Sequence, residues 1–126
     1  MLTIGAHMSI AKGIAKAAEN VIEMQANTMQ IFSRNPRGSS YKDYSRAEVD
    51  KFQTLRKDHE FGALLAHAPY TMNLASPRPE TYEFACTVIR EDTQEWTRWE
   101  LKTWYFIREA YRHRKGSRYS EYHCRT

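Results

Sequence analysis

The stretch LLAHAPYTMNLASP, residues 64–77, decides which fold we expect for this chain. It begins within a short apolar run at 63–66, whose length and composition predict a buried strand. His67 follows the run directly, and Pro69 and Tyr70 come shortly after it. Functional side chains of parallel α/β proteins gather just beyond the carboxyl ends of the strands. His67 therefore stands where a metal ligand is common, although a hydrogen-bonded loop histidine has the same local sequence.

The apolar pattern on both sides of this strand predicts an alternation of strands and helices. We expect strands at residues 2–6, 27–32 and 63–66, and helices at about 11–24, 46–59 and 80–92. Ser9 is expected to cap the first helix, and Ser45 with Glu48 forms a capping-box pattern before the second. The order β-α-β-α-β-α indicates an α/β fold with a parallel sheet and right-handed crossovers. Loops at 7–9, 33–38 and 67–73 then lie together at the carboxyl end of the sheet.

Length and composition limit the class of protein. A chain of 126 residues can form one domain with a core, but an eight-stranded α/β barrel typically needs roughly 250 residues. Cys86 and Cys124 are the two cysteines, and they form neither a CxxC pair nor a disulfide framework. The first nine residues lack the features of a signal peptide, and no stretch approaches the ~20 apolar residues of a membrane span. We expect a soluble, cytoplasmic protein without a membrane partner.

The composition changes sharply near residue 93. Residues 1–92 carry 11 Lys and Arg against 11 Asp and Glu, whereas residues 93–126 carry 8 against 4. The net charge of +4 therefore arises entirely in the last 34 positions, which also hold all three tryptophans. Basic and aromatic residues alternate at 111–119, a composition that also occurs in single-strand nucleic-acid binding segments. The change marks a boundary in the chain.

Several residues of the three loops have side chains suited to metal or DNA binding. His7 follows the first strand as His67 follows the third, and a structural role or one that supports a metal ligand suits it better than direct ligation. Arg34 and Arg37, with Asn35 between them, suit a phosphate backbone, although a solvated polar loop has the same composition. Tyr70 is a candidate for stacking on a base or wedging into a duplex.

Taken together, IGAHMS at 4–9, NTMQIFSRNPRG at 27–38 and LLAHAPYTMNLASP at 64–77 resemble the endonuclease IV family of apurinic/apyrimidinic endonucleases. The resemblance covers residues 1 to about 94 and implies the N-terminal portion, about three βα units, of a (β/α)8 barrel. It implies a DNA repair enzyme that uses a three-zinc cluster to cleave double-stranded DNA 5′ to abasic sites. On that pattern His67 is a zinc ligand, Arg37 enters the DNA, Tyr70 wedges beside the abasic sugar, and Asn35 contacts DNA. The full-length family is expected to be monomeric.

The resemblance ends after Gln94, where the family continues with a strand ending in FHPGSH. Codons can be chosen for residues 95–110 so that a reading frame shifted by two bases encodes MDTMGAKNLVFHPGS. Codons for residues 111–125 can likewise be chosen so that a frame shifted by one base encodes TGIGKGVDIASIIAE. We therefore expect residues 1–94 to be a partial barrel and residues 95–126 to be an out-of-frame tail rather than a domain. The change in composition near residue 93 then needs no functional explanation, because an out-of-frame segment is not selected for packing or binding.

One histidine cannot hold a zinc cluster, because zinc sites need three or four protein ligands. We therefore expect this chain to be an inactive or barely active fragment of an abasic-site endonuclease. Two other functions stay open. The first is a non-enzymatic DNA-binding module that uses Arg34, Arg37, Tyr70 and the basic tail. The second is a fragment of a metal-dependent sugar isomerase barrel.

Overall fold

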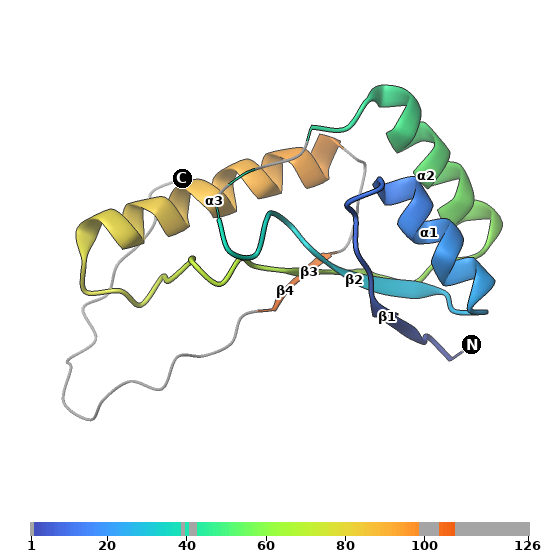
Figure 1. Ribbon diagram of the computed structural model, residues 1–126, viewed down its shortest axis with the longest axis horizontal. Helices are drawn as coiled ribbons and strands as arrows, with labels where there is room; N and C mark the ends of the chain where they lie inside the picture. The colour runs from blue at the N-terminus through green and yellow to red at the C-terminus, as the bar shows by residue number, and fades with distance from the viewer. Residues whose placement is uncertain (1, 39, 41–42, 99–103, 108–126) are drawn as a thin grey trace.

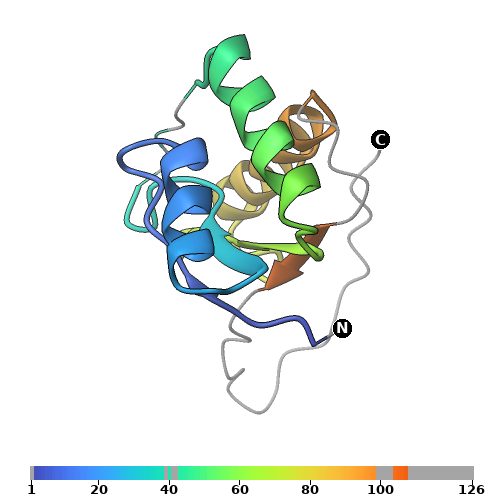
Figure 2. The same cartoon turned by 90° about the vertical axis from the view of Figure 1, so that its right-hand side faces the viewer.

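Strands and helices alternate along the chain as the sequence predicts. The computed structural model describes residues 2–38, 40, 43–98 and 104–107. The elements are β1 (Gly5–His7), α1 (Ile14–Glu23), β2 (Thr28–Phe32), α2 (Arg46–Asp58), β3 (Leu64–His67), α3 (Pro79–Arg98) and β4 (Trp104–Ile107). The strands form a parallel sheet in the order β1-β2-β3-β4. All three helices lie on one side of this sheet (Figures 1 and 2). A sheet whose strands follow one another in chain order, with all helices on one side, is typical of a (β/α)8 barrel. Doubly wound sheets instead carry helices on both faces.

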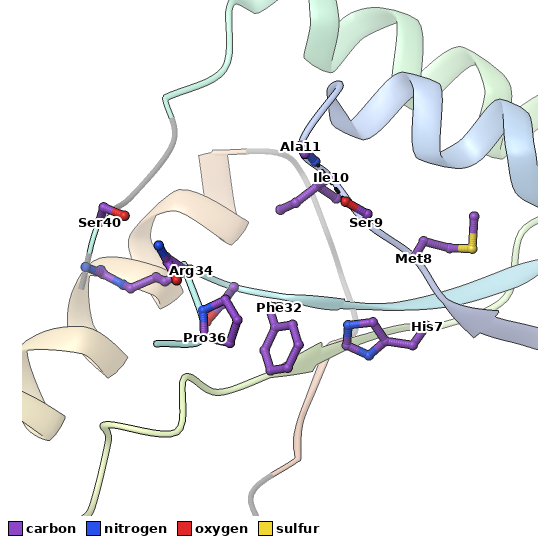
Figure 3. Close-up of a pocket in the computed structure, with 11 residues that line it drawn as sticks. His7, Met8, Ser9, Ile10, Ala11, Phe32, Arg34, Pro36 and Ser40 are labelled. Atoms are coloured by element: carbon purple, nitrogen blue, oxygen red, sulfur yellow. Dashed lines mark hydrogen bonds between the residues drawn. The ribbon is translucent and has the colours of Figure 1, made fainter. Parts of the chain in front are cut away.

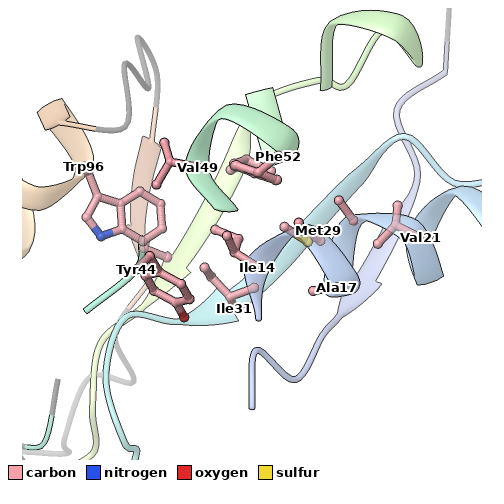
Figure 4. Close-up of a cluster of buried hydrophobic side chains, with 13 residues drawn as sticks. Ile14, Ala17, Val21, Met29, Ile31, Tyr44, Val49, Phe52 and Trp96 are labelled. Carbon is pink, nitrogen blue, oxygen red and sulfur yellow. The ribbon is translucent and has the colours of Figure 1, made fainter. Parts of the chain in front are cut away.

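The helix-covered face of the sheet holds the main core. Alternate residues of β2 and β3 point into it, so Met29, Ile31, Leu64 and Ala66 are at most 1% exposed. Side chains from α1 and α2 pack onto them, with Phe52 fully buried at the centre (Figure 4). The remaining members of this cluster are Ile14, Ala15, Ala17, Ala18, Val21, Tyr44, Val49 and Trp96.

The first strand is Gly5–His7 rather than residues 2–6, and α3 and the sheet extend further than the sequence predicts. The third helix was expected to end at about residue 92 but continues to Arg98. Trp96 explains the extension, because it is 3% exposed and packs into the same core as α1 and α2 (Figure 4). The sheet also has a fourth strand, since residues 104–107 pair with β3. Of the predicted out-of-frame tail, residues 99–103 and 108–126 lie outside the described residues.

The cap of α1 is also different from the prediction. Ser9 was expected to cap this helix, but the helix begins at Ile14, with Gly13 as its cap residue and no side-chain hydrogen bond from that residue. Glu48 from α2 accepts the Ile14 N–H instead, at 2.8 Å. Gly13 has φ +110, and a Cβ there would collide with the Glu48 carboxylate. The predicted cap of α2 is confirmed, because Ser45 Oγ accepts the Glu48 N–H at 3.2 Å. Glu48 thus uses its backbone in one cap and its side chain in another.

The opposite face of the sheet carries no helix among the described residues (Figures 1 and 2). Gln30, Phe32, Leu65 and His67 alternate with the core residues and are half-buried on this face. All three residues of β1 are exposed. In the part of the chain that the structure describes, no helix is long and apolar enough to cross a membrane. The uncovered face therefore offers polar and aromatic side chains rather than a second core.

Candidate functional site

The carboxyl ends of β1, β2 and β3 bring two histidines and two aromatic rings together. Phe32 lies between His7 and His67, with ring centroids 4.6 Å and 4.7 Å away. The two imidazole centroids are 6.3 Å apart. Tyr70 closes the group, at 5.8 Å from His67 and 5.4 Å from Phe32. The sheet register explains this cluster, because His67 pairs with Phe32 and His7 pairs with Gln30, two positions earlier on the same face.

Among the described residues, the hydrogen bonding of His67 leaves its Nε2 available to a metal. Its Nδ1 lies 2.8 Å from the backbone oxygen of Ala68. Since a carbonyl oxygen only accepts hydrogen bonds, Nδ1 must donate its proton. The neutral ring then has its lone pair on Nε2. Metal-binding histidines commonly donate their other N–H to a backbone carbonyl in this way, so the local geometry of His67 suits a zinc ligand.

His7 is held differently. The Gln30 side-chain amide donates from Nε2 to His7 Nδ1 at 2.9 Å, with the amide in its assigned orientation. The neutral ring then carries its proton on Nε2 and has no lone pair left for a metal. Partial burial, and secondarily the nearby His67, lower the pKa of His7. These contacts favour the structural role predicted for His7 over direct ligation.

The loops that follow β2 and β3 are joined by backbone hydrogen bonds. Tyr70 donates its N–H to the carbonyl of Pro36 at 3.0 Å. Asn35 and Arg37 are exposed, and the Asn35 side-chain oxygen accepts the Arg37 N–H at 3.0 Å. Tyr70 is 62% exposed although its ring contacts Phe32 and His67. The three residues predicted to contact DNA are therefore placed on adjacent loops beside His67.

Arg34 does not belong to this exposed group. The sequence suggested that it could bind phosphate together with Arg37, but its side chain is only 5% exposed. Its Nε donates to Asp92 Oδ1 at 2.6 Å, and its Nη2 donates to Glu91 Oε2 at 2.7 Å. Both carboxylates come from α3. This part of the prediction is wrong, because charges almost sixty positions later in the sequence bind the guanidinium.

Two clefts flank the strand ends. A cleft of about 580 Å³ lies between the loop after β1 and the loop after β2, with His7 and Phe32 in its wall (Figure 3). A second cleft of about 400 Å³ lies between the loop after β3 and the start of α3, lined among others by His67, Tyr70 and Arg78. His67 and Tyr70 therefore border a hollow that could receive a ligand group.

The donor set is incomplete for a zinc centre. Within the residues that the structure describes, no three His, Cys, Asp or Glu side chains are grouped closely enough to hold a metal ion. Zinc sites use three or four protein ligands, and His67 offers one suitable nitrogen. The local geometry fits a single ligand of such a centre and not a complete centre.

Sequence reasoning missed two members of the cluster. Phe32 was predicted only as the end of a strand, and Gln30 as one of its interior residues. The sequence could have predicted their position, because Gln30 and Phe32 alternate with the core residues Met29 and Ile31 and so lie on the opposite face. Phe32 then separates the two imidazoles, and Gln30 fixes the ring of His7.

Known proteins resemble this chain in sequence and in structure, although no family model matches it. The Probable endonuclease 4 of Clostridium botulinum is 45% identical over 92 residues, which are 73% of this chain and 33% of the relative. That of Heliobacterium modesticaldum is 44% identical over 89 residues, 71% of this chain and 32% of the relative. The crystal structure of endonuclease IV from Thermus thermophilus matches with a TM-score of 0.72 and 27% identity, over 82% of this chain and 39% of that one.

Over about 72% of its length this chain is similar to proteins named endonuclease 4, as the sequence predicted. It spans about a third of the length of the curated relatives that it matches. The structural match to an endonuclease IV confirms the fold predicted from the resemblance, which is part of a (β/α)8 barrel. His7, Phe32 and His67 lie at the carboxyl ends of their strands, which is the end of a (β/α)8 barrel where active sites are generally found.

Proposed function

We propose that this chain carries the first part of the site of a DNA repair endonuclease that cleaves double-stranded DNA 5′ to abasic sites. The observation that carries the proposal is the position of His67. Its Nε2 has the lone pair of a metal ligand, and loops with Arg37 and Tyr70 lie directly beside it. A metal-binding nitrogen next to a cationic, aromatic surface suits hydrolysis of a phosphodiester in DNA.

In the proposed mechanism Nε2 of His67 would hold zinc, together with ligands that the described residues do not supply. When bound, clustered zinc ions would supply hydroxide at neutral pH and stabilise the attacking and leaving oxygens of a phosphodiester displacement. The Ala68 carbonyl fixes the imidazole by accepting a hydrogen bond from the Nδ1–H group. Phe32 packs against the same ring and restricts its rotation.

The DNA side of the mechanism uses the two joined loops. The exposed guanidinium of Arg37 would bind backbone phosphate or enter the duplex, and the Asn35 oxygen orders its backbone. The exposed ring of Tyr70 would wedge beside the abasic sugar, where no base opposes it. Because Tyr70 also contacts His67, this wedge would place the damaged site next to the metal. A DNA substrate also suits the cytoplasmic location expected from the sequence.

We further propose that the 126-residue polypeptide alone does not cleave DNA, since the described residues supply too few zinc ligands. We retain the hypothesis that residues 95–126 are read out of frame. The coding DNA tests it directly, and we expect the shifted reading to restore FHPGSH. An uninterrupted gene without that shifted motif would rule the frameshift out.

DNA affinity tests the proposed binding surface without requiring catalysis. We would titrate the chain into labelled duplexes with and without an abasic site, over a range of salt. We expect preference for the abasic duplex, and Arg37→Ala should weaken binding and reduce the salt slope by about 1. Lys57→Ala is the control, because it removes an exposed positive charge from the last turn of α2, the helix end that leads to the amino end of β3 rather than to the carboxyl ends of the strands. Equal effects of the two variants, or preference for a small sugar over DNA, would contradict the proposal.

A further inference from the structure

We propose that Arg34 is a positioning residue, whose ion pair with Asp92 fixes the loop that presents Asn35 and Arg37. The inference rests on the proposed function, because it assigns the placement of the DNA-contacting loop to a contact outside that loop. The two arginines of the loop would then have different tasks: Arg37 faces solvent, and Arg34 faces the protein.

The position of Arg34 in the chain makes such an anchor effective. Ser33 ends the regular sheet contacts, since its N–H donates to the His67 carbonyl at 3.1 Å. Arg34 is the next residue, and the turn with Asn35 and Arg37 follows at once. Holding the side chain at the base of the loop therefore limits the paths that the backbone can take beyond it.

The two carboxylates that bind Arg34 are not equivalent. The side chain of Asp92 is 2% exposed, whereas that of Glu91 is 54% exposed. A buried charge pair with good geometry costs a great deal to break, because one ion is left without a partner in a dry site. A pair with one exposed partner is screened by water and contributes little. Asp92 is therefore the anchor and Glu91 the weaker contact.

The loop beyond the anchor is held by local hydrogen bonds that can open independently of the core. Asn35 donates its N–H to the Ser40 carbonyl at 3.2 Å, and Gly38 donates to the Asn35 carbonyl at 3.2 Å. Exposed turns of this kind open at low free energy unless a buried contact restrains them. The Arg34–Asp92 pair is such a contact, and it ties the loop after β2 to α3.

Amide hydrogen exchange of the full chain tests this inference, with Asp92→Asn as the first variant. We expect exchange at Asn35 and Gly38 to accelerate about tenfold or more, while amides of the core helices α1 and α2 keep their protection. Glu91→Gln, the matched control, should change exchange at the same amides by less than about threefold. Binding of abasic duplex should weaken in Asp92→Asn in parallel with the loss of protection.

Asp92→Asn could unfold the chain by leaving Arg34 buried without its counter-ion. The double variant Arg34→Ala with Asp92→Ala removes both charges together, so that no buried ion is left unpaired, and its short side chains also remove the contact between the loop and α3. It should fold and still show rapid exchange at Asn35 and Gly38. Unchanged loop protection in a folded double variant would overturn the inference. If the loop loses protection but wild-type protein shows no preference for abasic DNA, the anchor stands and the proposed function fails.

Discussion

The two faces of the sheet differ, because one holds the core and the other carries Phe32 and His67 of the proposed site. On the helix-covered face, Met29, Ile31 and Leu64 are buried under α1 and α2. On the other face, Phe32 and His67 alternate with them and remain half-buried. The period of two along a strand makes this division possible, because neighbouring residues point in opposite directions. Substitutions on the two faces should therefore affect different properties.

The largest contrast is expected between two phenylalanines. Phe52→Ala removes a fully buried ring from the core and should cost about 3–5 kcal/mol of unfolding free energy, measured with urea. Phe32→Ala removes a half-buried ring from the uncovered face and should cost less than half as much. It should instead let the His67 ring rotate more freely, because the Phe32 ring contacts it. Equal destabilisation by both variants would show that the second face is packed as tightly as the first.

A smaller effect is expected at the junction of the helices that form the core layer. Glu48→Ala removes the acceptor of the Ile14 N–H and should destabilise the protein by about 1 kcal/mol. Glu48→Gln keeps a side-chain oxygen and should recover most of that loss. Thermal unfolding of both variants measures the difference. If Glu48→Ala is neutral, the contact with α1 does not act as a cap.

The pattern of correct and wrong predictions follows the range of the interactions. Ser45 was placed correctly because its partner, Glu48, is three residues away. The cap of α1 and the partners of Arg34 were missed because they come from 34 and about 58 residues away along the chain.

The position of His67 at a strand end could be predicted, since an apolar run and the alternation of elements determine it locally. Its register with Phe32 could not, because it depends on how two strands align.

The smallest expected effect is a loss of folding stability at alkaline pH, caused by Tyr44 in the core. Burial, together with the charge of Glu48, raises the pKa of Tyr44 above its ordinary value. The unfolded phenol ionises near pH 10, while the folded one keeps its proton. Stability from Tyr44 is therefore complete below about pH 10 and is lost as the pH rises further.

Urea unfolding at pH 9 and pH 11 checks this sign. We expect Tyr44→Phe to lose about 1 kcal/mol less stability than the wild type between pH 9 and pH 11, because it has no phenol that ionises on unfolding. Tyr70→Phe, at an exposed position, serves as the control and should behave like wild type. An identical loss in Tyr44→Phe and wild type would mean that the Tyr44 phenol contributes nothing to the alkaline transition.

Incision of abasic duplex DNA tests the central claim, which is that this chain holds one metal-ligand strand end and the DNA-contacting loops of an incomplete site. The purified 126-residue chain would be incubated with abasic duplex and added zinc, beside a full-length endonuclease IV as a positive control. We predict binding of the abasic duplex without cleavage. Robust cleavage 5′ to the abasic site that EDTA abolishes would contradict the account, because it would require a complete zinc centre in this chain.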